Sequence, residues 1–203
     1  MAYTIEEEQE IAALKTWWRD NYKSLFAVII IALGSIAGWR YWQHSQVAKV
    51  QQMSVQYDQL LFSTQDDAKK NAQIDEFVKA NGNTGYATFA LFEQARMDAA
   101  KQDFAGAEKA LKQAISNAPD QILSSVAALR LSSVQFQQQH FDDALASLNQ
   151  VIDPSWASRK ALFTGDIQLA KGDKAAAKLS YETAQKNASP LEQQWVQMRL
   201  NNL

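Results

Sequence analysis

The pattern of apolar and polar positions sets one segment apart from the rest of the chain. Residues 24–42, SLFAVIIIALGSIAGWRYW, hold a single charged side chain, Arg40, and show no polar face before it. A helix of this length covers about 28 Å, close to the ~30 Å thickness of the hydrocarbon core of a bilayer. The pattern therefore predicts one helix that crosses a membrane.

Aromatic rings flank both ends of this segment, as is typical of helix ends that lie at membrane–water interfaces. The flanking residues, with one adjoining arginine, are Trp17, Trp18, Tyr22, Trp39, Arg40, Tyr41 and Trp42. Lys23 and Arg40 can extend their stems outward and keep their charges in water. We expect this set to mark the two interfaces of the span with the lipid bilayer.

Two other interpretations of the segment stay open. A buried helix of a soluble protein would normally show a polar face at this length. Ser35 and Ala37 have the small side chains and the spacing that a signal peptidase reads, but a signal peptide has a short basic leader. Residues 1–23 carry three basic and five acidic side chains, so an uncleaved signal anchor is favoured over a cleaved signal peptide.

The basic residues around the span give a weak indication of its orientation. Three basic residues precede the span: Lys15, Arg19 and Lys23. Two lie at or beyond its far end: Arg40 and Lys49. Cytoplasmic flanks are enriched in lysine and arginine. The count therefore favours a cytoplasmic N-terminus only slightly.

Gly34 and Gly38 form a G-x-x-x-G pattern within the span. Small residues at this spacing let a second membrane helix approach closely. Glycine is common in membrane helices, so chance occurrence is the alternative to a packing face.

Beyond the span, apolar positions are confined to one side of a continuing helix. A second helix is predicted from about Asp67 to Ala80, with Gly82 as its stop.

From there the sequence contains an internal repeat. The segments 102–119, 139–154 and 172–190 align, with spacings of 37 and 33 residues between equivalent positions. The aligned columns are Ala107, Ala144 and Ala177, then Leu111, Leu148 and Tyr181, then Ala114, Val151 and Ala184. This alternation of small and large residues predicts helix faces pressed closely on their neighbours.

A partner helix is expected before each aligned segment, over about 88–101, 123–138 and 157–171, and Pro119, Pro154 and Pro190 are expected to stop the second helices. The unit resembles the tetratricopeptide repeat, a helix–turn–helix of about 34 residues. No copy carries the full motif, since Trp and Tyr are missing from the usual first-helix positions.

The predicted fold is therefore all-α: a single transmembrane helix followed by a tetratricopeptide-repeat-like α-solenoid. Gly165 is expected where two helices nearly touch, and Gly172 in a turn. The closing helix is expected to cover the last repeat with Trp195 and Met198. The predicted divisions are 1–23 as N-terminal tail, 24–42 as signal anchor, 43–82 as extended helix and helix pair, and 83–203 as repeats with a capping helix.

Composition and charge narrow the function. The chain has 203 residues, 47% hydrophobic and 21% charged, and a net charge of −2, which argues against a nucleic-acid binder. It contains no cysteine, which excludes disulfides, thiolate metal sites and cysteine nucleophiles. No catalytic or phosphate-binding motif occurs, and His44 and His140 stand alone. We expect no enzyme, cofactor, metal or small-molecule substrate.

A binding surface is the remaining candidate. In tetratricopeptide repeats the first helix of each unit lines a concave face, and carrying those positions across gives one groove set. Its members are Phe89, Phe92, Arg96, Val126, Leu129, Phe136, Arg159, Leu162 and Leu169. Such a groove suits extended or unfolded peptide. The alternative is that many of these side chains pack against the neighbouring repeat.

Four segments carry a closer resemblance: Gly38–Trp42, LRLSSVQ at 129–135, GD…KGDKAAA at 165–177, and the terminal NNL. With them the chain resembles the YfgM family, the ancillary SecYEG translocon subunits of proteobacterial inner membranes. The resemblance implies a cytoplasmic N-terminus and a periplasmic repeat domain beside the SecYEG translocon.

It also implies a PpiD-type membrane-anchored periplasmic chaperone as partner, unfolded secretory proteins as clients, and handover of translocated proteins to periplasmic chaperones. The alternatives are an envelope scaffold, or a regulator of the RcsB-dependent stress response, without direct client binding. The resemblance supplies no catalytic residues.

Overall fold

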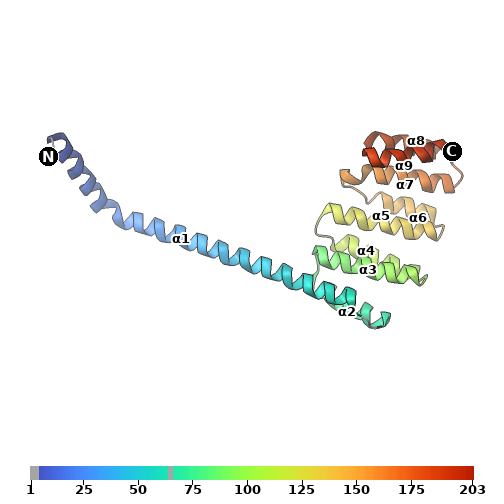
Figure 1. The fold of residues 1–203 in the computed structure, drawn as a ribbon, viewed down its shortest axis with the longest axis horizontal. Helices are drawn as coiled ribbons and strands as arrows, with labels where there is room; N and C mark the ends of the chain where they lie inside the picture. Colours follow the sequence, from blue (N-terminus) through green and yellow to red (C-terminus); the bar gives the residue numbers. More distant parts are fainter. Residues whose placement is uncertain (1–4, 64–65) are drawn as a thin grey trace. The chain divides into compact units, whose positions relative to one another are not determined.

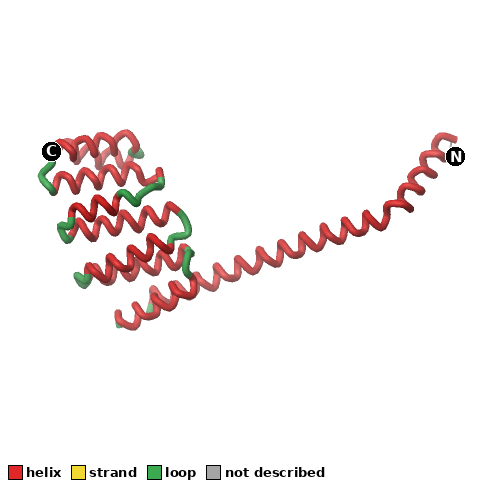
Figure 2. Tube along the Cα trace, turned by 180° about the vertical axis from the view of Figure 1, so that it is seen from behind, coloured by secondary structure: helices red, strands yellow, loops and turns green. Residues whose placement is uncertain are grey.

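A computed structural model describes residues 5–63 and 66–203; residues 1–4 of the predicted tail and residues 64–65 lie outside this description. Within the described ranges, every regular element is helical (Figures 1 and 2). The chain divides into two compact units, Met1–Gln52 and Met53–Leu203. The all-α fold class predicted from the sequence is confirmed.

Helix α1 (Ile5–Phe62) makes up the described part of the first unit, and its last residues, from Met53, belong to the second. Its apolar window is long and hydrophobic enough to cross a membrane, with a mean hydropathy of 1.6, and no part of that window is buried within the protein. The core helix of a soluble protein would be mostly buried. Ser35 donates its hydroxyl to the carbonyl of Ile31 at 2.8 Å, so this polar group is satisfied inside the helix, as apolar surroundings require.

The second unit stacks helices in pairs (Figure 1). Its helices are α2 (Asp67–Asn81), α3 (Gly85–Ala100), α4 (Phe104–Asn117), α5 (Gln121–Gln137), α6 (Phe141–Leu148), α7 (Ala157–Ala170), α8 (Lys174–Asn187) and α9 (Pro190–Asn201). A short 3₁₀ helix, η1 (Pro154–Trp156), precedes α7. From α2 onward each α-helix packs on the next one in the chain, so three repeats, α3–α4, α5–α6 and α7–α8, follow one another.

The three repeats share one turn geometry between their first and second helices. Gln102, Gln139 and Gly172 occupy equivalent positions and all have positive φ, at 64°, 62° and 87°. In each turn, the next residue donates its amide to a carbonyl five residues earlier at 2.9 Å. This is the Schellman pattern of a helix C-terminus. Only the third copy uses glycine there, so the first two turns accept a left-handed glutamine that sequence rules disfavour.

The residue that follows each positive-φ residue is the N-cap of the second helix. The carboxylates of Asp103 and Asp173 accept backbone amides of α4 and α8 at 2.9 Å. His140 stands at the equivalent start of α6, without a side-chain cap bond. Pro119 follows the end of α4, whereas Pro190 is the first residue of α9. Proline has no amide to donate and is well suited to a first helical position.

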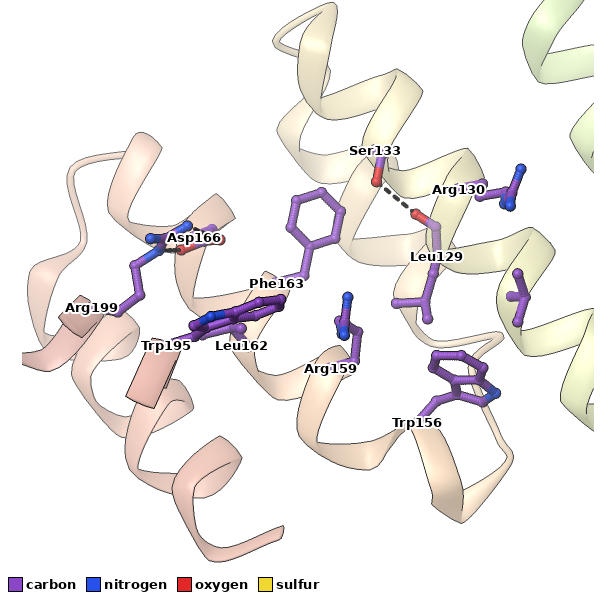
Figure 3. A pocket seen from close by; sticks show the side chains of 11 residues that line it. Leu129, Arg130, Ser133, Trp156, Arg159, Leu162, Phe163, Asp166, Trp195 and Arg199 are labelled. Atoms are coloured by element: carbon purple, nitrogen blue, oxygen red, sulfur yellow. Dashed lines mark hydrogen bonds and ion pairs between the residues drawn. The ribbon is translucent and has the colours of Figure 1, made fainter. Parts of the chain in front are cut away.

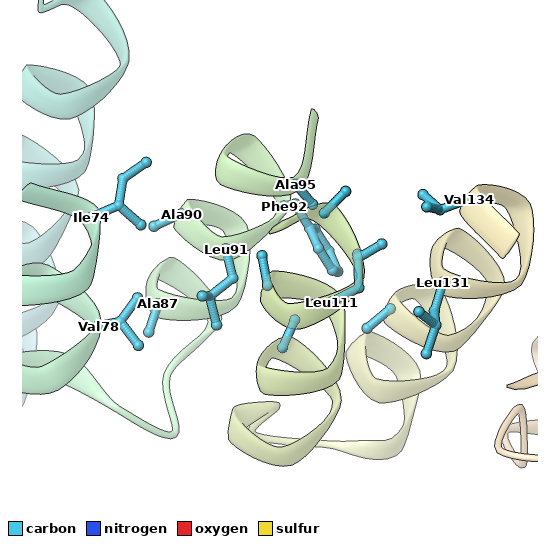
Figure 4. Close-up of a cluster of buried hydrophobic side chains, with 14 of the residues drawn as sticks. Ile74, Val78, Ala87, Ala90, Leu91, Phe92, Ala95, Leu111, Leu131 and Val134 are labelled. Carbon is cyan, nitrogen blue, oxygen red and sulfur yellow. The ribbon is translucent and has the colours of Figure 1, made fainter. Parts of the chain in front are cut away.

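Among the described residues, the buried apolar side chains form three clusters that follow one another along the stack, the first over α2 to α5, the second over α5 to α7 and the third over α7 to α9. Figure 4 shows the first, in which Leu91, Leu111 and Leu131 come from α3, α4 and α5. Small residues let these helices approach. In the third cluster Gly165 faces the ring of Tyr181, and a Cβ at Gly165 would lie 2.4 Å from that ring. The predicted close contact at Gly165 is confirmed.

The closing helix α9 covers the last repeat with a different face from the predicted one. Trp195 is 45% exposed and Met198 is also exposed, whereas Val196 is fully buried against Tyr181 and Ala184. Leu200 and Leu203 pack on the same cluster. The prediction for Trp195 and Met198 was wrong, because the direction from which α9 approaches sets which face is buried.

The end of α1 is joined to the repeats by apolar contacts and by a hydrogen bond from Lys70, which is also ion-paired with Glu93. Met53, Tyr57 and Leu60 pack against the first core cluster. The ammonium of Lys70 lies 3.3 Å from the carbonyl of Leu61 and 3.4 Å from the Glu93 carboxylate. This contact gives the C-terminal end of α1 a cationic partner and connects it to α3.

Glu93→Gln is expected to lower the free energy of unfolding by about 1–2 kcal/mol at pH 7, since it leaves Lys70 without its carboxylate. The pKa of Glu93 lies below its ordinary value, first because Arg96 donates hydrogen bonds to it and also because Lys70 is close. The charged carboxylate therefore stabilises the fold above about pH 4.5, and this stabilisation is lost as the pH falls through the lowered pKa. Denaturant unfolding from pH 7 to 3 should show a shallower acid loss for Glu93→Gln than for the wild type. Equal slopes would contradict the prediction.

Candidate functional site

Four of the nine predicted groove residues line one cavity of about 410 Å³, formed by α5, η1, α7 and α9 (Figure 3). Val126 and Leu129 come from α5, and Arg159 and Leu162 from α7. We call this the larger cavity. Its remaining lining residues are Arg130, Ser133, Trp156, Phe163, Asp166, Trp195 and Arg199.

Two more predicted residues, Phe92 and Arg96, line a second cavity of about 220 Å³ between α3, α4 and α5. We call this the smaller cavity. Phe92 is only 6% exposed, and the Arg130 guanidinium lies 4.3 Å from the centre of its ring. Phe89 is 40% exposed and makes ring contacts with Tyr57 and Phe92.

Like Phe89, the other two predicted residues line neither cavity. Phe136 packs its ring against Phe141 and Phe163. Leu169 packs on the cluster of Tyr181 and Val196. The predicted set therefore separates into residues that line a cavity and residues that hold neighbouring repeats together.

Three arginines and one aspartate set the charge of the larger cavity. Arg199 donates its Nε to Asp166 at 2.8 Å, and this bond is the first reason why the pKa of Arg199 is raised. Arg159 lies 3.8 Å from Glu192, with its guanidinium 5.6 Å from the centre of the Trp195 ring. The cavity thus combines an apolar floor with excess positive charge.

Asp166 also accepts a hydrogen bond from the Tyr181 hydroxyl at 2.8 Å. Burial, and next this bond, raise the pKa of Tyr181, so the phenol stays protonated and keeps donating. Because Tyr181 is on α8 and Arg199 on α9, one carboxylate connects three helices. Asp166 is therefore a structural residue at the edge of the cavity.

The larger cavity contains residues that the sequence interpretation missed. Arg130 and Ser133 lie one turn along α5 from Val126 and Leu129, and Phe163 and Asp166 extend the Arg159–Leu162 face of α7. Their helical spacing could have identified them. Trp195 carried no such signal, because its position depends on how α9 crosses α7.

Gly34 and Gly38 have open space around them: a Cβ at either position meets no atom within 4 Å. The predicted interface aromatics are exposed along α1, and the rings of Trp39 and Trp42 lie 5.3 Å apart. Across residues 5–63 and 66–203, no group of three acidic or histidine side chains is arranged to hold a metal.

Comparison with known proteins finds one family model and a set of relatives that share one name. A family model described as a tetratricopeptide repeat-like domain matches residues 15–203. A Haemophilus influenzae protein named ancillary SecYEG translocon subunit is 52% identical over 204 residues, covering 100% of both chains. Proteins with the same name from Aggregatibacter actinomycetemcomitans and Escherichia coli are 53% and 29% identical, over 100% and 97% of this chain and 100% and 96% of their own length. None of these names describes an enzyme.

Proposed function

The chain belongs to the family of ancillary SecYEG translocon subunits with a tetratricopeptide repeat-like domain, and from this premise we propose that it is itself a membrane-anchored subunit of the SecYEG translocon. The apolar, unburied window of α1 supports a single span in the bacterial inner membrane. We place the N-terminus in the cytoplasm and the repeat unit in the periplasm, in line with the basic residues before the span.

The observation that carries the functional proposal is the larger cavity. It is open, has an apolar floor and is flanked by arginines (Figure 3), which suits side chains of an extended segment rather than a chemical reaction. We propose that it contacts unfolded secretory chains, and that the repeat unit passes them to a PpiD-type membrane-anchored chaperone. Tethering beside the channel would give effective concentrations on the order of millimolar, so weak contacts suffice.

In-cell photocrosslinking tests this function. A photoreactive residue at Leu129 or Arg159 is expected to crosslink translocating chains during active secretion, whereas one at Leu179, which is exposed on α8, should not. Mass spectrometry of the products would identify the partners. Equal yields at all three positions, or no secretory chains at Leu129 and Arg159, would contradict client binding and favour the envelope scaffold.

A regulatory role in the RcsB-dependent stress response predicts a different result. If the cytoplasmic tail carried that role, deleting residues 2–15 would abolish the effect of the protein on the stress response. We expect that deletion to leave the Leu129 crosslinks intact.

Gly34→Leu combined with Gly38→Leu is expected to reduce copurification with SecYEG severalfold, because large side chains would prevent close approach of a second helix. The two changes disturb no packing within this chain, since the space around both positions is open. Ile29→Leu with Ile36→Leu is the matched control. Unchanged recovery of the channel with the glycine variant would reject the packing face.

A further inference from the structure

Arg130 stands between the two cavities. It projects from α5, and together with Ser133 it lines both the larger and the smaller cavity. In Figure 3 it lies at the α5 side of the larger cavity, away from Trp195 and Arg199. A ligand that occupied both cavities would have to pass Arg130.

Arg130 differs from the neighbouring arginines because no carboxylate of the described residues pairs with its charge. Arg96 donates two hydrogen bonds to Glu93, at 2.8 and 2.7 Å, and Arg199 pairs with Asp166. Among the residues that the structure describes, Arg130 forms no ion pair, and its guanidinium lies over the face of the Phe92 ring. A guanidinium that lies on an aromatic face keeps its N–H donors in its own plane, free to bind a carboxylate.

The positions of the two cavities also indicate in which directions a bound peptide would extend from Arg130. Apolar space is present on both sides of Arg130, so a bound chain would extend past it in both directions. This arrangement favours the side chain of an internal acidic residue over a terminal carboxylate. Neighbouring helices lie about 8–10 Å apart, and an extended chain advances about 3.3 Å per residue. Apolar residues about three positions before and after the acidic residue would reach the two cavities.

We propose that Arg130 binds the carboxylate of an internal aspartate or glutamate in an extended segment of a protein ligand, whose apolar side chains on either side enter the smaller and the larger cavity. This proposal rests on the proposed function and specifies the ligand that the repeat unit recognises. The apolar contacts supply attraction, and the single carboxylate sets register and selectivity.

The test uses the full-length protein in nanodiscs and a labelled eleven-residue peptide, with binding followed by fluorescence anisotropy. The peptide has aspartate at its centre, leucine three positions before it, phenylalanine three positions after it, and glycine and serine elsewhere. The wild-type protein is expected to bind this peptide about tenfold more tightly than its asparagine-centred analogue. Arg130→Gln should remove that preference, and Lys178→Gln on α8 should preserve it.

Reversing the charge at position 130 tests whether this residue itself binds the central side chain of the peptide. Arg130→Glu is expected to prefer a lysine-centred peptide over the aspartate-centred one. Equal wild-type binding of the aspartate and asparagine peptides would overturn the proposal without needing any protein variant. Equal loss of preference in Arg130→Gln and Lys178→Gln would also overturn it, since general charge would then explain the effect.

The outcomes separate this inference from the proposed function. Crosslinks from Leu129 to secretory chains together with no peptide preference would overturn the role of Arg130 and leave the client-binding function standing. A clear aspartate preference without such crosslinks in cells would support the role of Arg130 and reject the function.

Discussion

Gly165→Ala is expected to lower the free energy of unfolding of the repeat unit by about 2–3 kcal/mol and its melting temperature by roughly 5–10 °C. The added Cβ would lie 2.4 Å from the Tyr181 ring, far inside contact distance. Tyr181 is fully buried and its hydroxyl is bonded to Asp166, so the ring has little room to move. This cost exceeds the gain of about 1 kcal/mol that alanine brings to a helix interior.

The repeat itself suggests the compensating change. Gly165 aligns with Ala95 and Ser132 of the earlier repeats, while Tyr181 aligns with Leu111 and Leu148. The repeat with the largest side chain in one column, Tyr181, thus has the smallest residue in the other, Gly165. Gly165→Ala with Tyr181→Leu should therefore be less destabilised than the two single changes added together.

Thermal unfolding followed by far-UV circular dichroism measures this double-mutant cycle. Gly85→Ala is the control, because its new Cβ would be 3.7 Å from Leu123, an ordinary contact. We expect little change in stability for that variant. If Gly165→Ala were as stable as the wild type, or if the two changes were simply additive, the close contact would not be the cause of the glycine requirement.

Ile30→Arg combined with Leu33→Arg is expected to release the protein from the membrane. Each arginine near the centre of a spanning helix costs about 2.5–3.5 kcal/mol of insertion free energy, so the pair costs several powers of ten in partitioning. Both side chains are exposed on α1, so no packing within the protein is lost. After cell fractionation and a carbonate wash, the variant should be found in the soluble fraction.

Val47→Arg with Val50→Arg is the matched control, since these exposed residues lie on the same helix beyond the predicted span. It should remain in the membrane pellet with the wild type. Retention of the Ile30/Leu33 variant would contradict a spanning role for this segment. N-terminal sequencing of the wild-type protein would show cleavage if the chain began near Gly38, and an intact tail if the segment is an anchor.

The sequence by itself determined the parts of this protein that depend on local pattern. The run of residues 24–42, in which Arg40 is the single charged side chain, could be identified as a candidate membrane span because burial in lipid requires an apolar helix of about that length. The columns through Ala107 and Leu111 could be identified because each repeat buries the same face of its second helix. Aspartates at the starts of α4 and α8 follow the same local logic, since capping needs only a side chain and the next turn.

The sequence could not determine which side chains of the groove stay accessible. Phe92 and Leu129 come from equivalent first helices, yet Phe92 is buried under Arg130, while Leu129 lines the larger cavity. Trp195 was assigned to the core and lies beside Arg159 instead. Periodicity fixes which residues share a helix face, but accessibility depends on how far the next helix is displaced and rotated, which arises from side-chain packing between repeats. Only the tertiary structure therefore decided that Arg130 lies between two cavities without an ion pair to any residue that the structure describes, and that Asp166 joins three helices.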